Sequence, residues 1–476
     1  MAEEPLHSTS EEVIEVPSAE SDPPKEESVV IEESKVVEEL EIAQSISFKE
    51  ESNLVGELPD AHKKALDELK QLVQDALAKH EFYSPPVEAP KPAEEAKVEE
   101  QGEKAPEEAP KEEEKKEEEE KKEEEKKEEA PIEPEEVFLY GIPLLGDDKS
   151  DVILLKFLRA REFKVKEAFS MIKNTVKWRK EFGIDSLLEE DFGSEYDKTF
   201  YVRGVGKEGH PVFYNAFGAF VDKDFYHSCF GDEEKRTRFL RWRIQQLEKN
   251  VRKLDFSPSG ISTFIHVNDF KNFLMITKRD VRQATNQAVQ ILQDNYPEFA
   301  AKQVFINVSW WYLAFNRMIS PFFTQRTKSK FVYAGPTKSA ETLFRYVSPE
   351  HVPVLFGGLH RDGEKEFCES DAVSEAIIKP SSKHTVEFPV SEKCCLAWEL
   401  RMIGWEASYG AEFVPSHEEG YTVIVSKTRK VSGNDEPVVG DTYKIGESGK
   451  MVVTIENLSS RKKKLLYRFK SKPLVD

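Results

Sequence analysis

The 476-residue sequence has little cysteine and no long apolar run. Its four cysteines contain no CxxC pair and are too few for a disulfide framework in a chain of this length. We therefore expect free thiols and a reducing, cytoplasmic environment. The opening residues MAEEPLHSTS have neither the basic nor the apolar region of a secretory signal. No apolar run approaches the about 18 residues of a membrane span, so we expect any membrane contact to be peripheral.

The sequence also lacks the short motifs of common enzymes. It has no GxxxxGK[ST] loop, no HExxH and no GxSxG. The letters GVGKEG at 204–209 match a dinucleotide fingerprint, but a strand follows them where that fingerprint needs a helix, so we predict a hairpin-like turn. His266 and Asp269 could be imagined as a catalytic pair, yet no nucleophile accompanies them. We expect no enzyme activity, no metal and no cofactor.

The net charge of −22 is unevenly distributed along the chain. Residues 1–136 hold 45 acidic and 17 basic side chains, a net charge of −28, whereas residues 137–476 have a net charge of +6. We predict that 1–136 is an acidic disordered region with one helix near 60–80, for which Asp60 can serve as the N-cap. The Glu–Lys run within it has no apolar face and is expected to be a spacer. Competition of this tail with anionic surfaces is the alternative.

The remaining chain divides into two kinds of pattern. Apolar residues at helical spacing predict a helical subdomain over 137–193, and strands alternating with helices over 194–360 predict an α/β domain with a largely parallel sheet. Over 366–476 the apolar residues recur with period two, in about eight short strands separated by turn residues. The predicted fold class is thus α/β, followed by an all-β sandwich.

One stretch, ISPFFTQRTKSK at 319–330, places aromatic residues directly beside basic ones. Aromatic rings and cations together suit a membrane interface, where rings lie among headgroups and cations meet phosphates. The end of a buried helix followed by a solvated turn is the alternative. Two other basic groups, at 159–166 and 236–243, are expected to be solvated faces. Nucleic acid is not an expected partner, because the sequence has no zinc finger, RNP motif or long basic arm.

Several motifs give the chain a family resemblance. LLKFLRAREFKV with KWRKEFG resembles the helical N-terminal part of CRAL-TRIO proteins, and DNYPE, VFINV, PFFTQRTKSKF and VPVLFGG resemble a Sec14 lipid-binding domain in the same order. WELRMIGWEASYGAEFVP and SRKKKLLYRF resemble a GOLD domain. An acidic tail, a Sec14 domain and a GOLD domain in this order are similar to the plant patellins.

The resemblance implies a cavity that holds one phospholipid, and no cofactor other than this bound lipid. The bound lipid is expected to be a phosphatidylinositol or phosphoinositide, with its tails under a mobile helix at 310–323. Matching motif positions imply headgroup contacts from Arg161, Glu298, Thr327 and Lys330. The implied gate and acyl-chain contacts are Trp310, Trp311, Phe315, Phe322 and Phe323.

The chain departs from the family pattern in two places. Glu162 follows Arg161 where many relatives carry a base, which leaves the headgroup geometry open. Phe264 and His266 occupy positions where phosphatidylcholine-exchanging relatives have small hydroxyl residues, so choline-lipid exchange is not expected.

Further basic residues are candidates for contact with a membrane surface. They are Arg326, Lys328, Arg461, Lys462, Lys463 and Lys464, and a solvated turn or a hairpin-end charge cluster is the alternative for each group. The resemblance implies a cytoplasmic, peripheral phosphoinositide-binding protein of membrane trafficking, with a role in cell-plate formation at the plasma membrane. Protein partners are expected at the GOLD domain. The alternatives are a lipid-sensing adaptor and a carrier of another hydrophobic ligand, such as a tocopherol or sterol.

Overall fold

The computed structural model describes residues 51–83, 135–272, 279–309, 325–363, 366–391, 393–404, 406–417, 419–432 and 436–473. The predicted gate helix at 310–323 therefore lies outside the described residues. The helices are α2 (Asp60–Ala78), α4 (Asp148–Ala160), α5 (Val165–Phe182), α6 (Ile184–Leu187), α7 (Lys223–Phe230), α8 (Glu233–Val251), α9 (Arg279–Asn295), α11 (Gln325–Lys330) and α12 (Ser339–Leu343). Short 3-10 turns are η1 (Val55–Glu57), η2 (Phe217–Val221) and η5 (Val354–Phe356).

The strands fall into a small hairpin, a central sheet and a sandwich. The hairpin and central sheet contain β1 (Phe138–Leu139), β2 (Ile142–Pro143), β3 (Phe200–Val205), β4 (Pro211–Ala216), β5 (Phe264–Asp269), β6 (Ala300–Ile306) and β7 (Phe331–Tyr333). The sandwich contains β8 (Ser374–Ile378), β9 (Lys383–Val390), β10 (Cys394–Met402), β11 (Ala407–Pro415), β12 (Val423–Val431), β13 (Val439–Ile445), β14 (Gly449–Asn457) and β15 (Lys463–Pro473). The predicted α/β fold with a separate all-β sandwich is confirmed.

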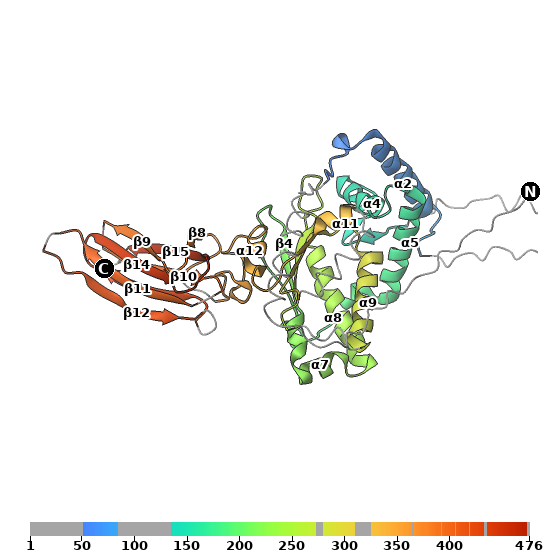
Figure 1. Ribbon diagram of the computed structural model, residues 1–476. Coiled ribbons are helices and arrows are strands. Elements are labelled where there is room, and N and C mark those ends of the chain that lie inside the picture. The colour runs from blue at the N-terminus through green and yellow to red at the C-terminus, as the bar shows by residue number, and fades with distance from the viewer. Residues whose placement is uncertain are drawn as a thin grey trace, which may run out of the picture.

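Helices α2, α4 and α5 form one packed unit (Figure 1). The apolar stripe of α2 is buried in the same core as α4 and α5, so the helix predicted in the acidic region is a structural part of the helical subdomain. The helical subdomain therefore includes α2 in addition to the helices of the predicted range 137–193. The N-cap of α2 is Pro59 and makes no side-chain capping hydrogen bond. The expectation that Asp60 is the N-cap was wrong: Asp60 is the first residue of the helix, and the extended backbone ends one residue earlier, at Pro59.

Helix α4 begins at a full capping box. The Asp147 carboxylate accepts from the backbone N–H of Lys149 and Ser150, and the Ser150 hydroxyl accepts from the Asp147 N–H. Its residues 150–159 are all buried, so the helix lies inside the subdomain. Within the helical subdomain predicted over 137–193, the chain turns after α4, where Glu162 and Phe163 have positive φ of 50° and 60°. This turn sets α5 against α4.

The central sheet has the strand order β3-β4-β5-β6-β7. Strand β3 is antiparallel to β4, and each later pair is parallel. Gly204 near the end of β3 and Gly209 in the turn to β4 have φ of 64° and 90°, in the region where glycine has no steric penalty. GVGKEG is thus a hairpin turn, as predicted, and no helix follows it to face a dinucleotide pyrophosphate.

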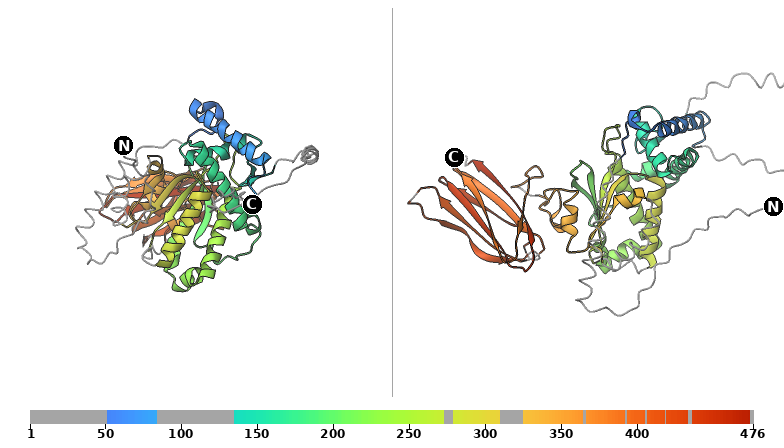
Figure 2. Two further views of the ribbon diagram at one scale, coloured as in Figure 1. Left: turned by 90° about the vertical axis from the view of Figure 1, so that its right-hand side faces the viewer. Right: turned by 45° about the horizontal axis from the view of Figure 1, so that its top comes forward.

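Each face of the central sheet packs against a different layer. Phe213 and Phe264 face the large core shared with α8 and α9, whereas Tyr214 and Val267 face a second core with α12. This alternation follows from the period of two along each strand. Figure 2 shows the helical layer on one side of the sheet and the short α12 on the side toward the sandwich.

The sandwich consists of two antiparallel four-stranded sheets, ordered β13-β10-β15-β8 and β12-β11-β14-β9. Their inward-facing residues form one core that includes Trp398, whose indole N–H donates to the Tyr409 hydroxyl at 3.0 Å. On β14, Met451, Val453 and Ile455 are buried on the inner face, as their period-two spacing predicted.

The junction between the sandwich and the sheet domain combines apolar packing with hydrogen bonds. Leu466 of β15 is fully buried in the same core as Leu343 and Phe344. Arg401 of β10 donates from Nη1 to the carbonyls of Val354 and Gly358, at 2.7 and 2.8 Å. These contacts fasten the sandwich to the segment that follows α12.

Candidate functional site

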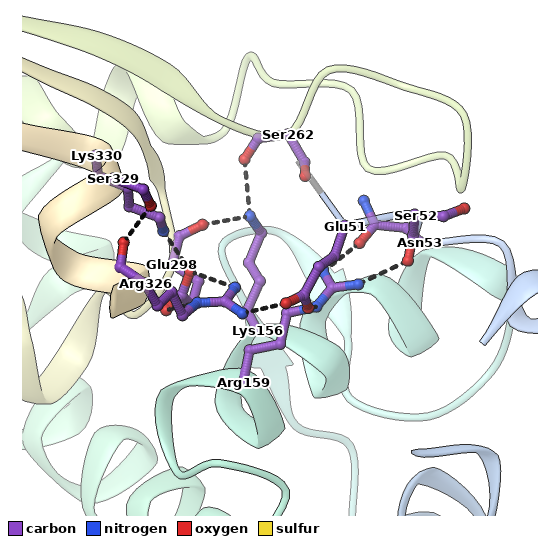
Figure 3. A network of polar contacts seen from close by, with 10 residues as sticks. All are labelled: Glu51, Ser52, Asn53, Lys156, Arg159, Ser262, Glu298, Arg326, Ser329 and Lys330. Atoms are coloured by element: carbon purple, nitrogen blue, oxygen red, sulfur yellow. Dashed lines mark hydrogen bonds and ion pairs between the residues drawn. The ribbon is translucent and has the colours of Figure 1, made fainter. Parts of the chain in front are cut away.

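Glu298 is the centre of a polar network at the start of β6 (Figure 3). Its φ of 56° turns the chain sharply between α9 and β6. The carboxylate accepts from Lys330 Nζ at 2.5 Å and from Arg326 Nη2 and Nε at 2.9 and 3.1 Å. Arg326 and Lys330 are four residues apart on α11, so both project from one helix face toward the same acid.

The charge of Glu298 is strongly stabilised. Burial alone would raise its pKa, but Lys330 and Arg326 outweigh burial and lower the pKa to about 2. Burial likewise opposes the charge of Arg326, yet the contact with Glu298 leaves the pKa of Arg326 raised. Glu298 and Arg326 are therefore both ionised at neutral pH, and Lys330 contacts the same carboxylate.

A second arginine continues the network into the segment before α2. Arg159, at the end of α4, is only 8% exposed. Its Nη1 donates to Asn53 Oδ1 at 2.5 Å and its Nη2 to the Ser52 carbonyl at 2.7 Å. Glu51 bridges Arg159 and Arg326, with Oε2 3.0 Å from Arg159 Nε and Oε1 2.5 Å from Arg326 Nη1. The segment 51–53 thus closes one side of the network.

Lys156, one turn before Arg159 on α4, also lies in this network. Its Nζ donates to the carbonyls of Ser262 and Glu298 at 2.9 and 3.0 Å and lies 4.4 Å from the centre of the Phe299 ring. The network therefore gathers four basic side chains and two carboxylates from α4, α11, the start of β6 and the segment before α2.

The four predicted headgroup residues are only partly brought together. Glu298 and Lys330 are in direct contact, whereas Arg161 lines a groove of about 580 Å³ between α5 and the end of α9, with Trp178 and Asp294 among its other walls. Thr327 lies on α11, and its side chain is outside the described residues, as is that of Lys328.

The residues predicted to form the gate, Trp310, Trp311, Phe315, Phe322 and Phe323, lie outside the part of the chain that the structure describes. Arg326, which the sequence left as a surface candidate or a solvated turn, is instead half-buried and ion-paired with two acids. Its position on a short helix opposite Glu298 explains the difference.

Sequence reasoning missed a row of polar residues on the sheet face toward α8. Arg243 Nη2 donates to Asn215 Oδ1, Asn215 Nδ2 donates to Asn268 Oδ1, and Asn268 Nδ2 donates to Gln303 Oε1, at 2.9, 2.9 and 3.0 Å. The row runs from α8 across β4, β5 and β6. The only signal in the sequence was the recurrence of amides in strands that are otherwise apolar.

Burial perturbs the ionisable groups of this row. It lowers the pKa of Arg243 to about 9, and the guanidinium lies 3.7 Å from the centre of the Phe200 ring. Burial and then the charge of Arg243 lower the pKa of His266 to about 3. His266 is therefore neutral at physiological pH. The solvated face expected for 236–243 is wrong for Arg243, because this residue points from α8 toward the sheet.

The imagined pair of His266 and Asp269 does not form a catalytic arrangement. Residues three apart on a strand point to opposite faces, and the Asp269 carboxylate accepts from Asn307 Nδ2 at 2.6 Å and from the Lys271 N–H at 2.9 Å. Burial raises the pKa of Asp269 despite these bonds. Among the residues with described side chains, no group of three or more His, Cys, Asp or Glu has an arrangement that could hold a metal ion.

The basic run at 461–464 lies where β14 turns into β15. Arg461 and Lys462 are exposed, while Lys464 is ion-paired with Glu375 at 2.6 Å and lies 5.7 Å from the centre of the Phe344 ring. Burial, together with nearby Arg461, lowers the pKa of Lys463. The run thus divides into two exposed cations and two that face the rest of the protein.

No helix in the described parts of the chain combines the length and apolarity needed to cross a membrane.

Comparison with known proteins finds three family models that match successive parts of the chain. Residues 65–174 match the CRAL/TRIO N-terminal domain, 195–358 the CRAL/TRIO domain, and 379–464 the patellin-1-like C-terminal GOLD domain. The first match begins inside α2, in agreement with the packing of that helix against α4 and α5.

Comparison with individual relatives gives the same assignment. The chain is 50% identical to Patellin-3 of Arabidopsis thaliana over 90% of its own length and 78% of that protein, and 55% identical to Patellin-5 of the same plant over 71% and 51%. It is 29% identical to the phosphatidylinositol transfer protein SFH5 of Meyerozyma guilliermondii over 50% of its length and 72% of that protein. With its CRAL/TRIO and GOLD domains in this order, the chain belongs to the patellin family.

Proposed function

We propose that the chain binds a phosphoinositide, with the headgroup at the cluster of Glu298, Arg326 and Lys330. The observation that carries this proposal is a carboxylate shared by two cations at one end of the central sheet, since cations held in place by an acid are pre-organised for phosphate. Glu298 can also accept from inositol hydroxyls. Support comes from a relative named as a phosphatidylinositol transfer protein.

The predicted role of Arg161 and Thr327 stays part of this proposal. Arg161 offers a planar guanidinium suited to phosphate, and its Nη1 donates to the Ala160 carbonyl at 3.2 Å in this structure. The aromatic residues at 310–323 would cover the acyl chains, each buried CH2 contributing about 0.8 kcal/mol. No covalent step and no cofactor other than the bound lipid are part of the proposal.

We propose that the protein is cytoplasmic and associates peripherally with membranes. Membrane trafficking, and cell-plate formation in particular, is the proposed process. Two exposed cations, Arg461 and Lys462, offer the sandwich a weak contact with anionic lipid that would reinforce the first site.

Vesicle flotation with the full chain tests this proposal. Phosphatidylcholine vesicles that contain phosphatidylinositol 4-phosphate should bring more protein to the top of the gradient than phosphatidylcholine vesicles alone. The Lys330→Ala variant should lose most of that preference. Lys338→Ala is the matched control, because Lys338 is an exposed lysine paired with Glu341 at 2.9 Å. Equal flotation with both vesicle types would overturn the proposal.

A lipid-sensing adaptor is a second candidate function. It is favoured by the junction, where Arg401 and Leu466 fasten the sandwich to the segment next to the sheet. In this case protein partners would bind the sandwich, and a fluorescent-lipid transfer assay would show binding without transfer between vesicles. If lipid instead moved between vesicles at a rate comparable with its binding, a lipid-carrier function would be favoured over the adaptor.

A further inference from the structure

We propose that Arg159 and Arg326 form a phosphate subsite, which Glu51 of the same chain occupies until a phosphoinositide displaces it. The inference rests on the proposed function, because it concerns the same cluster. It adds the ligand chemistry, a phosphomonoester on the inositol ring, and a competing group, the segment 51–53.

The first argument is the geometry of the Glu51 carboxylate. Each of its oxygens meets a different arginine, Oε1 at 2.5 Å from Arg326 Nη1 and Oε2 at 3.0 Å from Arg159 Nε. A phosphate presents oxygens that guanidinium groups bind in the same way. The Glu51 carboxylate therefore stands where a phosphate group can bind.

The second argument is the charge balance of the site. Without Glu51, the carboxylate of Glu298 would be left among Arg159, Arg326, Lys330 and Lys156. Burial, and then repulsion from Arg326, oppose the charge of Arg159 and lower its pKa, while Glu51 acts in the opposite direction. Two arginines this close need an anion between them, and Glu298 is already shared with Lys330.

The third argument is that Glu51 can leave without unfolding the protein. Residues 51–54 belong to no helix or strand, and the first buried anchor after them is Leu58. The side chain of Glu51 is 39% exposed, that of Arg326 26% and that of Arg159 7%. The site is thus open on the side of Glu51 and closed behind Arg159, which gives an incoming phosphate a path.

Charge decides which ligands can compete. A carboxylate carries one negative charge, whereas a phosphomonoester carries about 1.5 to 2 at neutral pH. Phosphatidylinositol carries only its phosphodiester, whose single negative charge gives it no advantage in charge over the Glu51 carboxylate. Competition by Glu51 therefore acts on phosphorylated inositol lipids and not on phosphatidylinositol itself.

The test compares vesicle binding by full-length variants. Glu51→Gln should tighten binding to vesicles containing phosphatidylinositol 4-phosphate by about three- to tenfold, the range expected for losing one competing ion pair. Binding to phosphatidylinositol and phosphatidylserine vesicles should not change. Arg159→Gln and Arg326→Gln should weaken the preference for the monoester.

Glu57→Gln is the matched control, because Glu57 is an exposed acid on the neighbouring turn η1. If Glu51→Gln behaves like Glu57→Gln while the wild type prefers the phosphoinositide, the competition is absent and only this inference fails. An equal gain on phosphatidylserine vesicles overturns it too, since net charge alone would explain that gain. If no variant prefers phosphoinositide over phosphatidylcholine, the proposed function itself fails.

Amide hydrogen exchange gives a second readout that does not depend on membranes. Soluble glycerophosphoinositol 4-phosphate should accelerate exchange in the peptide around 51–57 of the wild type as the segment leaves the site. Inorganic phosphate should do so only at much higher concentration. The inference would be contradicted if the headgroup left exchange in 51–57 unchanged, or if inorganic phosphate accelerated exchange and the headgroup did not.

Discussion

Glu298 and Lys330, which are 32 residues apart in the sequence, form an ion pair of 2.5 Å in which both side chains are largely buried. Because Arg326 contacts the same carboxylate, the acid holds two cations in fixed positions. Because the buried acid neutralises only part of the charge around it, the cluster stays positive, and its cations are already in place before a ligand binds. This is the property that a headgroup site needs, since less order has to be imposed when the ligand binds.

Replacing Glu298 by Gln should destabilise the protein most at neutral pH. The native pKa of Glu298 is about 2, below its ordinary value of 4.5, so its ionised form stabilises the fold above pH 4.5. That contribution, about 3 kcal/mol, is lost as the pH falls through 4.5 toward 2. The difference in denaturation midpoint between wild type and Glu298→Gln should therefore shrink from about pH 6 to about pH 3, because most of this stabilisation is lost within that range.

The control for this measurement is Glu341→Gln, which removes an acid from an exposed pair with Lys338. Its effect should be small, within about 1 kcal/mol, at every pH. A gap for Glu298→Gln that is constant with pH would show that the carboxylate is not selectively stabilised in the native state.

The buried pair of Arg179 and Glu248 should be sensitive to loss of one partner. Arg179 of α5 donates from Nη1 and Nη2 to Glu248 of α8 at 3.1 and 2.6 Å, and Glu248 is fully buried. Arg179→Met should cost about 3 kcal/mol, because an incompletely paired carboxylate stays inside the protein. Urea denaturation followed by tryptophan fluorescence measures this change.

The pair has a built-in comparison on the same helix. Lys177 is exposed and lies 3.8 Å from Glu181, so Lys177→Met should change the free energy of unfolding by less than about 0.5 kcal/mol. The double variant Arg179→Met with Glu248→Leu should recover part of the loss, since no charge is then buried. Similar effects from Arg179→Met and Lys177→Met would contradict the assigned role of the buried pair.

Periodicity in the sequence predicted the elements well and the site only in part. The apolar spacing of α2 and the period of two in β14 depend on burial of one face, which the local sequence records. The pairing of Glu298 with Lys330 was within reach because the resemblance named both residues. The contacts of Arg159 with Glu51 and of Arg243 with Asn215 were not, because nothing local indicates which distant side chain meets an arginine.

His266 should stay neutral over the whole physiological range. Burial and the charge of Arg243 lower its pKa to about 3, so the native state resists the proton that the unfolded chain accepts near pH 6.5. Its contribution to stability is complete above pH 6.5 and is lost as the pH falls toward 3. In NMR spectra its ring signals should not shift between about pH 5 and pH 8, the range in which an ordinary histidine titrates.

The His266→Gln variant assigns the signal. A midpoint for His266 near 6.5, the ordinary value for histidine, would show that the sheet face around Arg243 is open to water.

Arg401 should control how tightly the sandwich is joined to the sheet domain. Its two bonds reach the carbonyls of Val354 and Gly358, and burial lowers its pKa to about 10. Arg401→Met keeps the apolar stem but leaves both carbonyls without this donor, so amide exchange over 354–360 should become faster. The amides of β14, inside the sandwich core, should keep their protection. Lys427→Met, an exposed change on β12, should alter neither segment. If exchange rises equally across the sandwich, Arg401 stabilises that domain itself and not its junction with the sheet.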